Sequence, residues 1–284
     1  MKHCLIVVNS FKKNAVLLGD EIKAFLSEHN VHSDIFSYNG STALHDGVEA
    51  SFDGYEFAVT LGGDGTVLFA GRNCAPIGIP VFAVNLGEFG FLAGIQVSEW
   101  RKKLSDYLNG LAFISERSLI LAEVLRDGKT VFDGRGMNDM LISSHGSSKL
   151  INLEVAYNHA LLGPFKTNGI LVSTATGSTG YSAAAGGPIV DPSLDAMLLT
   201  PISSFSLSAR PLVFGNEGEL AITVMHSRVP VSLTADGQIE FPLKENDVII
   251  LGLSEYKAHL VGATQENFYA ALQSKLNWSG GPRA

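Results

Sequence analysis

The sequence predicts an α/β N-terminal domain, with a helix-covered parallel sheet, followed by an all-β C-terminal domain. Up to about residue 110, apolar runs typical of buried strands alternate with segments of helical periodicity. After Leu111, short segments of alternating polarity are separated by turn pairs such as Asp127-Gly128 and Asn158-His159. Helical periodicity returns only near Thr264. We therefore place the two domains at 1–110 and 111–261.

The elements of the first domain follow from apolar runs and their spacing. Strands are expected at 4–8, 33–37, 57–61 and 81–85, and helices at 14–28 and 66–72. A further helix is predicted where apolar residues recur at helical spacing from Trp100 to Leu111, with Ser98 as its N-cap. The last helix is expected over 264–276, and the tail 278–284 is expected to be frayed.

Composition limits the classes of protein that fit. The chain has 284 residues, of which 46% are hydrophobic, enough for a sizeable core. The formal net charge of −8 argues against a nucleic-acid or anionic-membrane surface, and no apolar stretch reaches the roughly 18 residues of a membrane span. Cys4 and Cys74 form no metal-ligand pattern and are expected to be reduced packing residues. These observations predict a cytoplasmic protein that binds neither nucleic acid nor membranes.

The segment 174–182 is the most informative stretch of the chain. It places hydroxyl side chains and glycines directly after the apolar run 170–172. Such a loop brings backbone N–H groups and side-chain donors close to a polar ligand, where a bulky side chain would block the approach. Taken alone, the same composition also fits an ordinary surface loop.

A second signal is the turn Gly62-Gly63-Asp64-Gly65-Thr66, between an apolar strand and a helix-compatible segment. This arrangement attracts phosphate, because the helix N-terminus presents free N–H groups and a positive dipole end. Asp64 would repel phosphate, so its presence indicates a different role, such as binding Mg²⁺, orienting a sugar hydroxyl or taking its proton. The alternative is a tight turn in which Asp64 caps the helix. The turn matches neither the Walker A nor the dinucleotide-binding pattern.

These two segments, with three more in the same order, resemble the NAD kinase family. The shared segments lie at 62–66, 85–92, 136–139, 168–188 and 206–211, and Asp236-Gly237-Gln238 follows them. The resemblance implies that residues 262–284 return to complete the N-terminal domain. It implies transfer of the γ-phosphoryl group of ATP, or of polyphosphate, to the 2′-hydroxyl of the adenosine ribose of NAD. It also implies a divalent cation, expected to be Mg²⁺, and a homodimer or homotetramer. The preference between NAD and NADH stays open.

The chemistry of phosphoryl transfer assigns roles to the residues that carry the resemblance. Asp64 is the expected base that orients and deprotonates the 2′-hydroxyl, because it is the carboxylate inside the glycine turn. Asn138 can pair with both edges of adenine, and Asp139 can accept from ribose hydroxyls or from the adenine amino group; Asn138-Asp139 also fits a strand-edge turn. The donors to triphosphate oxygens are expected to be Gly62, Gly63, Gly65 and Thr66.

The other predicted ligand contacts each have a structural alternative. Phe91 could stack on adenine or belong to the core, and Lys149 and Lys166 could bind phosphate or be solvated. Asp236 could lie near the reacting phosphate and Gln238 near the dinucleotide, but Asp-Gly is also a strong hairpin-turn signal. Further binding residues implied by the resemblance are Asn168, Thr176, Thr179, Gly180, Tyr181, Ser182 and Ala184.

The chain departs from the family pattern at four positions. Asn168 stands where the family usually has Asp, so a role that needs a carboxylate there is in doubt. Ala175 replaces a usual proline and Gly180 a usual alanine, which should leave the loop more flexible. Phe205 occupies a position often held by histidine.

Two rival functions are compatible with parts of the sequence. A lipid kinase of the diacylglycerol or sphingosine type shares the Gly-Gly-Asp-Gly-Thr turn, but it gives no reason for segment 174–187 or for Asn138-Asp139. A non-catalytic NAD sensor on the same fold would keep the NAD contacts without turnover, and retention of Asp64 speaks against it.

Overall fold

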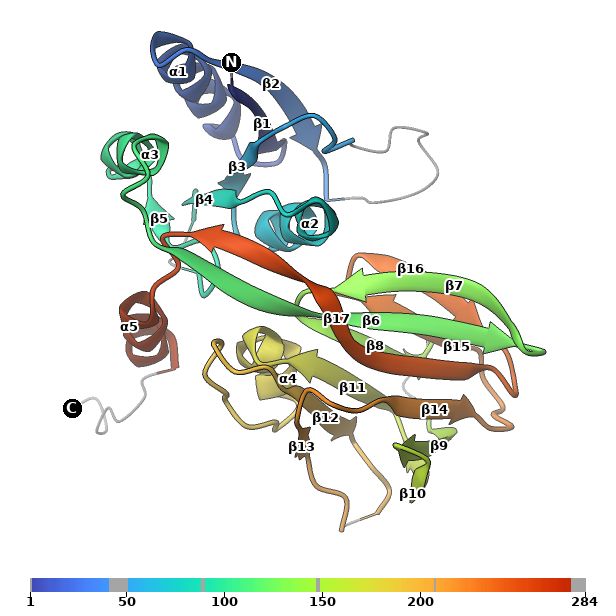
Figure 1. Ribbon diagram of the computed structural model, residues 1–284. Helices are drawn as coiled ribbons and strands as arrows, with labels where there is room; N and C mark the ends of the chain where they lie inside the picture. Colours follow the sequence, from blue (N-terminus) through green and yellow to red (C-terminus); the bar gives the residue numbers. More distant parts are fainter. Residues whose placement is uncertain (1, 41–50, 88–89, 147–148, 207, 277–284) are drawn as a thin grey trace. The chain divides into compact units, whose positions relative to one another are not determined.

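A computed structural model describes residues 2–40, 51–87, 90–146, 149–206 and 208–276 (Figure 1). The chain divides into two compact units: unit 1 consists of Met1–Glu116 and Ala258–Ala284, and unit 2 of Arg117–Lys257. The expected frayed tail lies outside the described residues. Among the described residues, no helix has the length and apolar character needed to cross a membrane.

Unit 1 is built on a parallel sheet. Its strands lie in the order β2 (Val31–Tyr38), β1 (Lys2–Asn9), β3 (Phe57–Gly62) and β4 (Val81–Asn85), and β4 also pairs with β5 (Ile95–Gln96) and with the end of β17 (Val248–Val261). All of these pairings are parallel. Three of the four predicted strands, β1, β3 and β4, are apolar runs that are largely buried, whereas the edge strand β2 alternates buried and exposed residues.

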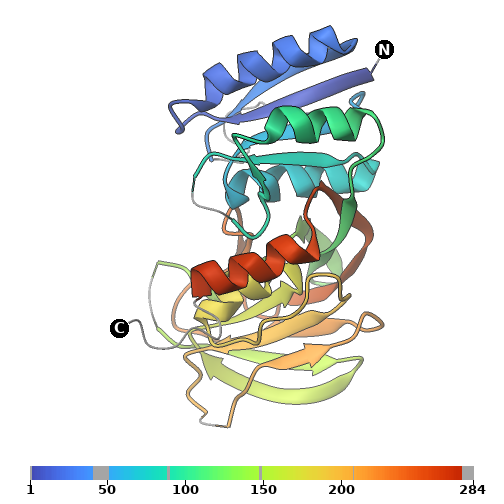
Figure 2. The same ribbon diagram turned by 90° about the vertical axis from the view of Figure 1, so that its left-hand side faces the viewer.

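Helices cover the two faces of this sheet. Helices α1 (Ala15–Glu28) and α3 (Trp100–Leu108) share one face, where the rings of Phe25 and Trp100 meet at 5.4 Å (Figure 2). Helix α2 (Asp64–Cys74) covers the other face, with Phe69 stacked on Tyr38 at 4.4 Å. The 3₁₀ turn η1 (Ala75–Ile77) follows α2, and α5 (Gln265–Leu276) is the last helix.

The prediction for α3 was wrong at both ends. Its N-cap is Glu99 rather than Ser98, and no side-chain hydrogen bond caps it. The helix ends at Leu108, because Gly110 adopts a left-handed conformation with φ of 73° that turns the chain away. Leu111 therefore lies beyond the helix and is 76% exposed.

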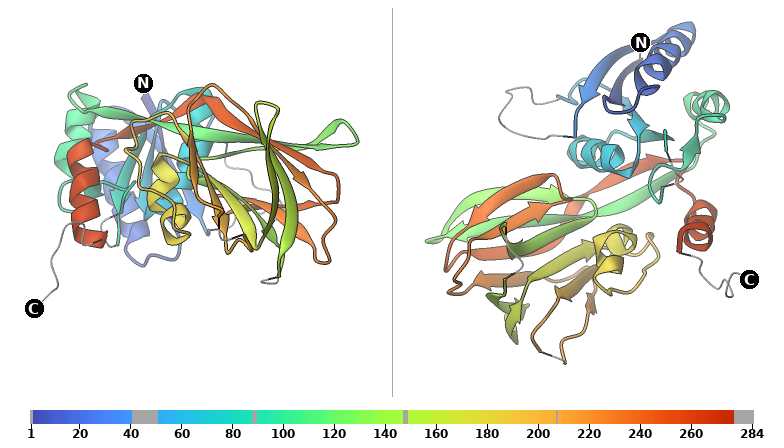
Figure 3. Two further views of the ribbon diagram at one scale, coloured as in Figure 1. Left: turned by 90° about the horizontal axis from the view of Figure 1, so that it is seen from below. Right: turned by 180° about the vertical axis from the view of Figure 1, so that it is seen from behind.

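Unit 2 is a β domain, so the predicted fold class is confirmed. Its strands are β6 Ile114–Arg126, β7 Lys129–Gly136, β8 Asp139–Ser144, β9 Ile151–Tyr157, β10 Ala160–Thr167, β11 Gly169–Thr174, β12 Met197–Ile202, β13 Leu212–Phe214, β14 Leu220–Val224, β15 Val231–Ala235 and β16 Ile239–Leu243. One sheet contains β10, β9, β14, β17, β6 and β7, and the other has the order β13-β12-β11-β8-β15-β16 (Figure 3). Both sheets contribute to one hydrophobic core.

The segment expected to be a loop also forms a 3₁₀ turn, η2 (Thr176–Thr179), and a one-turn helix, α4 (Tyr181–Ala184).

Three tight turns connect strands of unit 2 at dipeptides with two positive φ angles. These are Asp127-Gly128 (50° and 73°), Asn158-His159 (46° and 65°) and Asp236-Gly237 (50° and 66°). Two positive φ angles are typical of the hairpin turn that matches strand twist. Asp236-Gly237 is therefore a hairpin turn between β15 and β16, which was one of its two predicted roles.

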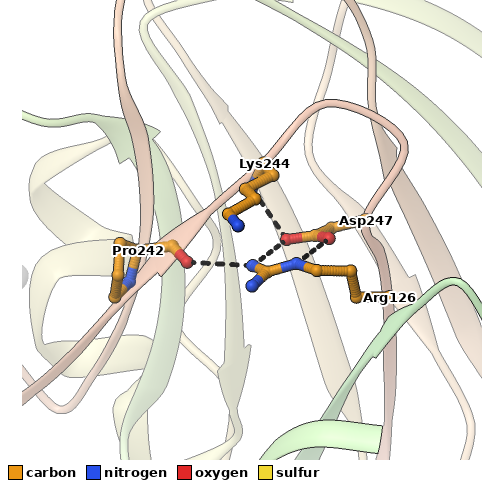
Figure 4. Close-up of polar contacts among 4 residues, drawn as sticks. All are labelled: Arg126, Pro242, Lys244 and Asp247. Carbon is orange, nitrogen blue, oxygen red and sulfur yellow. Dashed lines mark hydrogen bonds and ion pairs between the residues drawn. The ribbon is translucent and has the colours of Figure 1, made fainter. Parts of the chain in front are cut away.

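An ion pair between the partly exposed Arg126 and the buried Asp247 stabilises the turn between β16 and β17 (Figure 4). Arg126 donates from Nε and Nη2 to the two carboxylate oxygens of Asp247, at 2.8 and 2.7 Å, and the Lys244 N–H donates to the same carboxylate at 2.7 Å. Burial opposes ionisation of Asp247, but these hydrogen bonds outweigh it, so the pKa of the carboxyl lies below its ordinary value. The fully buried charge is thus paired.

The two cysteines lie in unit 1 as buried free thiols. Burial raises the pKa of both above the ordinary value of a thiol. This environment fits the expected packing role, since an inert structural cysteine keeps its proton.

Candidate functional site

The first part of the candidate site lies at the carboxyl ends of the parallel strands of unit 1. Strands β1, β3 and β4 end at Asn9, Gly62 and Asn85. The Asn9 amide donates to the Thr66 hydroxyl at 3.3 Å, and the Leu86 N–H donates to the Gly62 carbonyl at 2.8 Å. The predicted glycine turn is therefore joined to the ends of both neighbouring strands, the usual location of ligand sites in such sheets.

Glycine is required at position 62 by close packing. A Cβ atom there would lie 2.2 Å from the Thr66 hydroxyl oxygen. The chain then enters α2 with Gly63 as the N-cap and Asp64 as the first helical residue. Asp64 does not cap the helix, contrary to the alternative considered from the sequence. The Thr66 N–H donates to the Gly63 carbonyl at 3.0 Å, and the space beside Gly63 is open.

The Asp64 carboxylate instead binds three consecutive backbone N–H groups from a segment far along the chain. Oδ2 accepts from Phe91 at 3.0 Å, and Oδ1 accepts from Leu92 at 3.2 Å and Ala93 at 3.1 Å. A Cβ atom on Gly90 would lie 2.0 Å from Oδ1, so glycine is needed for this approach. A carboxylate has about four lone-pair positions, which leaves Oδ2 able to accept from a ligand hydroxyl.

A cavity of about 750 Å³ lies in unit 1. Its lining includes Lys12, Lys13, Asn85, Gly87 and Trp100. Sequence reasoning missed the two lysines, although adjacent lysines after the first strand of an acidic chain were a usable signal. They give the cavity positive charge.

Phe91 and the two predicted lysines are placed differently from one another. The half-buried ring of Phe91 lies 6.0 Å from that of Phe268, with Lys275 Nζ 5.6 Å from its centroid. Lys149 is exposed, and Lys166 Nζ lies 5.5 Å from the ring centroid of Phe205. The structure thus gives Phe91 packing partners within unit 1, and it pairs Lys166 with an aromatic ring.

In unit 2, Asp236 holds the predicted Asn138-Asp139 pair through backbone groups. Its carboxylate accepts from the N–H groups of Met137 at 2.9 Å, Asn138 at 2.7 Å and Asp139 at 3.0 Å. The Asp236 N–H in turn donates to the Asp139 carbonyl at 2.9 Å. The hairpin turn therefore orients the segment that carries the two candidate binding side chains.

The hydroxyl-rich loop closes on the same segment. The Thr174 hydroxyl donates to the Met137 carbonyl at 2.7 Å and accepts from the Gly177 N–H at 2.9 Å. A Cβ atom on Gly177 would lie 2.0 Å from the Asn138 carbonyl oxygen, so only glycine permits this packing. The two motifs that the sequence analysis treated separately thus form one structure in unit 2.

Polar atoms in this part of unit 2 are buried without partners. Within the described part of the chain, Asn138 Oδ1 and the Thr176 hydroxyl have no hydrogen-bond partner. The Asp139 side chain is buried, and burial, with repulsion from Asp236 adding to it, raises its pKa to about 7. An unsatisfied buried polar group costs about 1–3 kcal/mol. A ligand that supplies donors and acceptors here would recover that cost.

The remaining predicted residues fall into two groups. Thr179 donates to the Thr176 carbonyl at 3.3 Å, and the buried Ser182 hydroxyl lies 3.4 Å from that of Thr200. Tyr181 and Ala184 are exposed on α4. Gly180, Asn168 and Gln238 are partly exposed and are held through backbone N–H groups bonded to carbonyls of other residues.

The fit of a divalent cation can be tested on these residues. Hard cations such as Mg²⁺ prefer oxygen ligands and usually take one or two carboxylates together with substrate phosphates. Asp64 offers a carboxylate beside the glycine turn. Among the described residues, three clustered metal-ligating side chains occur only at His3, His32 and Asp34, away from this turn. The residues present fit a cation that phosphate groups help to bind.

Comparisons with known proteins decide the family. Family models for the ATP-NAD kinase N-terminal and C-terminal domains match residues 4–112 and 137–263. The chain is 44% identical to the NAD kinase of Treponema denticola over 281 residues, which cover 99% of this chain and 98% of that protein. The chain belongs to the NAD kinase family. The NAD kinase of Desulforamulus reducens is a more distant member, 34% identical over 97% of this chain and 98% of its own length.

Solved structures of NAD kinases share the fold. The yeast NADH kinase, crystallised with NADH, superimposes with a TM-score of 0.86 and 22% identity, covering 100% of this chain and 89% of its own. The Archaeoglobus fulgidus NAD kinase, crystallised with ATP, gives 0.76 and 21% identity, covering 95% and 96%. The predicted family, enzyme class and fold are thus confirmed, and neither the lipid kinase nor the sensor gains support.

Proposed function

We propose that this NAD kinase transfers the γ-phosphoryl group of ATP to the 2′-hydroxyl of the adenosine ribose of NAD, and that Asn138, Asp139 and Thr176 bind the adenosine part. The unpaired Asn138 Oδ1 and Thr176 hydroxyl, beside the buried Asp139 carboxyl, carry this proposal. Adenosine offers the ring nitrogens, amino group and hydroxyls that such atoms pair with. Segment 174–180, joined to segment 137–139 by hydrogen bonds, keeps these groups in place.

Asp64 is the proposed general base. Its carboxylate is oriented by three backbone N–H groups and keeps acceptor capacity on Oδ2. In phosphoryl transfer, catalysis depends on positioning the hydroxyl and stabilising the phosphate charge. A carboxylate held in this way can accept the proton of the 2′-hydroxyl as the new O–P bond forms and the bond between the γ-phosphorus and the departing ADP oxygen breaks.

Charge on the donor is neutralised by a cation and by lysines in this proposal. Asp64 would help to hold Mg²⁺, which would supply positive charge that offsets the charge of the phosphates. Lys12 and Lys13 line the cavity of unit 1 and add positive charge. The glycine turn supplies N–H groups at the start of α2.

We also propose a homodimer or homotetramer, located in the cytoplasm. Leu212 and Val213 are 41% and 52% exposed on β13, an edge strand of its sheet. Exposed apolar edge strands favour pairing with another chain. The two buried free thiols are compatible with a reducing compartment.

A coupled assay for NADP tests the reaction. Purified protein is incubated with NAD and ATP, then with polyphosphate in place of ATP, each with and without Mg²⁺. NADP should form with ATP and Mg²⁺, and removal of the cation should abolish turnover. A well-folded sample that binds NAD but shows no turnover with either donor would support the sensor function instead.

A further inference from the structure

Two histidines and an aspartate meet at the amino end of the sheet of unit 1, away from the glycine turn. His3 lies on β1, and His32 and Asp34 lie on β2. The ligating atoms of these three residues all lie within 4.8 Å of one another. His3 Nε2 is 2.9 Å from Asp34 Oδ2, and the rings of His3 and His32 lie 4.6 Å apart. We propose that these side chains form a binding site for a divalent transition-metal ion such as Zn²⁺.

The sheet fixes the positions of all three ligands. His3 and His32 are register partners on neighbouring parallel strands. Side chains alternate along a strand with a period of two, so Asp34 lies on the same face as His32. The ligands thus come from hydrogen-bonded strands rather than from a loop, and binding an ion requires only rotation of side chains. Sites built on rigid elements in this way are better preorganised than sites on loops.

The donor set suits zinc. Two imidazole nitrogens and one carboxylate oxygen are ligands that Zn²⁺ favours, with water in the fourth position of a tetrahedral site. The side chains of His3 and Asp34 are 32% and 47% exposed, so an ion can enter from solvent. The Tyr55 hydroxyl donates to Asp34 Oδ2 at 3.1 Å, and such outer hydrogen bonds orient a ligating carboxylate.

The site is open because α2 covers only the other half of this sheet face. Further along β2, Phe36 and Tyr38 stack on Phe69 of α2. His3 lies at the start of β1, whereas Asn9, beside the glycine turn, ends it. The two residues are six positions apart along the strand, which corresponds to roughly 20 Å at about 3.3 Å per residue. A bound ion would therefore fasten the edge strand β2 to β1 without taking part in phosphoryl transfer.

Zinc titration of protein purified without a histidine tag, in buffer containing Mg²⁺, tests the proposal. Calorimetry should detect one Zn²⁺ equivalent that is lost in His32→Ala, with a Kd increase above about 100-fold, because ligand removal should cost more than the 10–100-fold typical of outer partners. Tyr55→Phe should weaken binding about tenfold. Co²⁺ should give a tetrahedral visible absorption band in the wild type that His32→Ala lacks. Zn²⁺ should also raise Tm in the wild type, because it binds the folded state.

The matched control is His226→Ala. His226 is an exposed histidine 2.9 Å from Glu245, so it forms a comparable pair without a third ligand, and its removal should leave zinc binding unchanged. Circular dichroism and NADP formation without zinc should be unchanged in His32→Ala. The proposal is overturned if His32→Ala and Asp34→Asn bind Zn²⁺ as tightly as wild type, or if the wild type shows neither calorimetric binding nor a Co²⁺ band.

Discussion

Asp64 in unit 1 and Asp236 in unit 2 share one hydrogen-bonding pattern but orient different groups. Each carboxylate accepts from three consecutive backbone N–H groups, those of 91–93 for Asp64 and those of 137–139 for Asp236. Asp64 starts a helix after a glycine turn, whereas Asp236 opens a hairpin turn with φ of 50°. The bonds that Asp64 accepts orient the carboxylate itself. The bonds that Asp236 accepts orient its neighbours, the side chains of Asn138 and Asp139.

The contrast shows that a carboxylate cannot be assigned a role from its hydrogen bonds alone. What differs is the surroundings: Asp64 lies beside the glycine turn, and Asp236 lies beside polar atoms that are buried without a described partner. On this basis we propose that Asp64 acts in the chemical step and that Asp236 acts in binding. The sequence analysis allowed Asp236 a place near the reacting phosphate, and its contacts within unit 2 favour the binding role.

The largest effect is expected for Asp64→Asn, in kcat. The variant loses the proposed general base, which contributes roughly 10²–10⁴-fold, and should bind NAD as the wild type does. Asparagine keeps an acceptor for the N–H groups of Leu92 and Ala93 but places its NH₂ group against Phe91, so Tm should fall slightly. Steady-state kinetics and a thermal melt measure both. Retention of more than about a tenth of kcat would be less than that range allows and would remove Asp64 as the base.

Asp236→Asn should raise the KM for NAD, whereas Asp64→Asn should lower kcat. One of the three N–H groups of 137–139 loses its acceptor, at a cost of about 1–3 kcal/mol. The orientation of Asn138 and Asp139 changes with it, so the KM for NAD should rise about tenfold or more, the equivalent of about 1.4 kcal/mol. Kinetics against NAD at saturating ATP measure this. A kcat defect as large as that of Asp64→Asn, with unchanged KM, would remove the distinction between the two aspartates.

Asn138→Ala is expected to raise the KM for NAD by about 1–3 kcal/mol in equivalent free energy, with a smaller effect on kcat. The amide contacts are distant from the reacting hydroxyl, so they should be similar in ground and transition states. Because Asn138 Oδ1 is buried without a described partner, its removal should barely lower Tm. A large kcat loss at constant KM would instead indicate a positioning role for Asn138.

The smallest effect is a pH dependence that Asp139 imparts to NAD binding. Burial and then repulsion from Asp236 raise its pKa to about 7. The ionised form is the better acceptor for ribose hydroxyls, so the KM for NAD should fall as pH rises from 6 to 8, by up to about tenfold in total, as the ionised fraction rises. Asp139→Asn should flatten this profile. An unchanged profile in that variant would exclude Asp139 as its source.

The raised pKa of Asp139 also determines how the free energy of unfolding changes with pH. The pKa of Asp139 is higher in the folded protein than its ordinary value of 3.8. The folded state therefore holds this proton over a pH range where the unfolded chain has lost it. Asp139 thus lowers the free energy of unfolding as pH rises from about 4 to about 7, and not above.

Strands β1, β3 and β4 of unit 1 could be predicted because each is an apolar run bounded by turns. Strand β4 was expected at 81–85, where the structure has it. The ends of α3 could not be predicted, because Ser98 has the right residue type for a cap but the chain turns into the helix at Glu99. Local signals identify elements, and tertiary contacts decide where they end.

The segments that form the candidate site could be predicted from the sequence, but the contacts between them could not. Asp64 and Asn138-Asp139 stood out by residue type and order. Their backbone partners did not, because Asp64 and Phe91 are separated by 27 residues and Asp236 and Asn138 by 98. The glycines at 90 and 177 are required by these distant contacts, which only a folded chain reveals.

Parallel calorimetry of NAD binding to Asp64→Asn and Asp236→Asn tests the central claim most directly. Both variants make the same chemical change to the same hydrogen-bonding pattern, so each controls for the other. Asp64→Asn should bind NAD with wild-type affinity, and Asp236→Asn should bind about tenfold more weakly or worse, a loss of about 1.4 kcal/mol. Equal losses of affinity in both variants, or a loss in Asp64→Asn alone, would contradict the assignment of chemistry to Asp64 and of binding to Asp236.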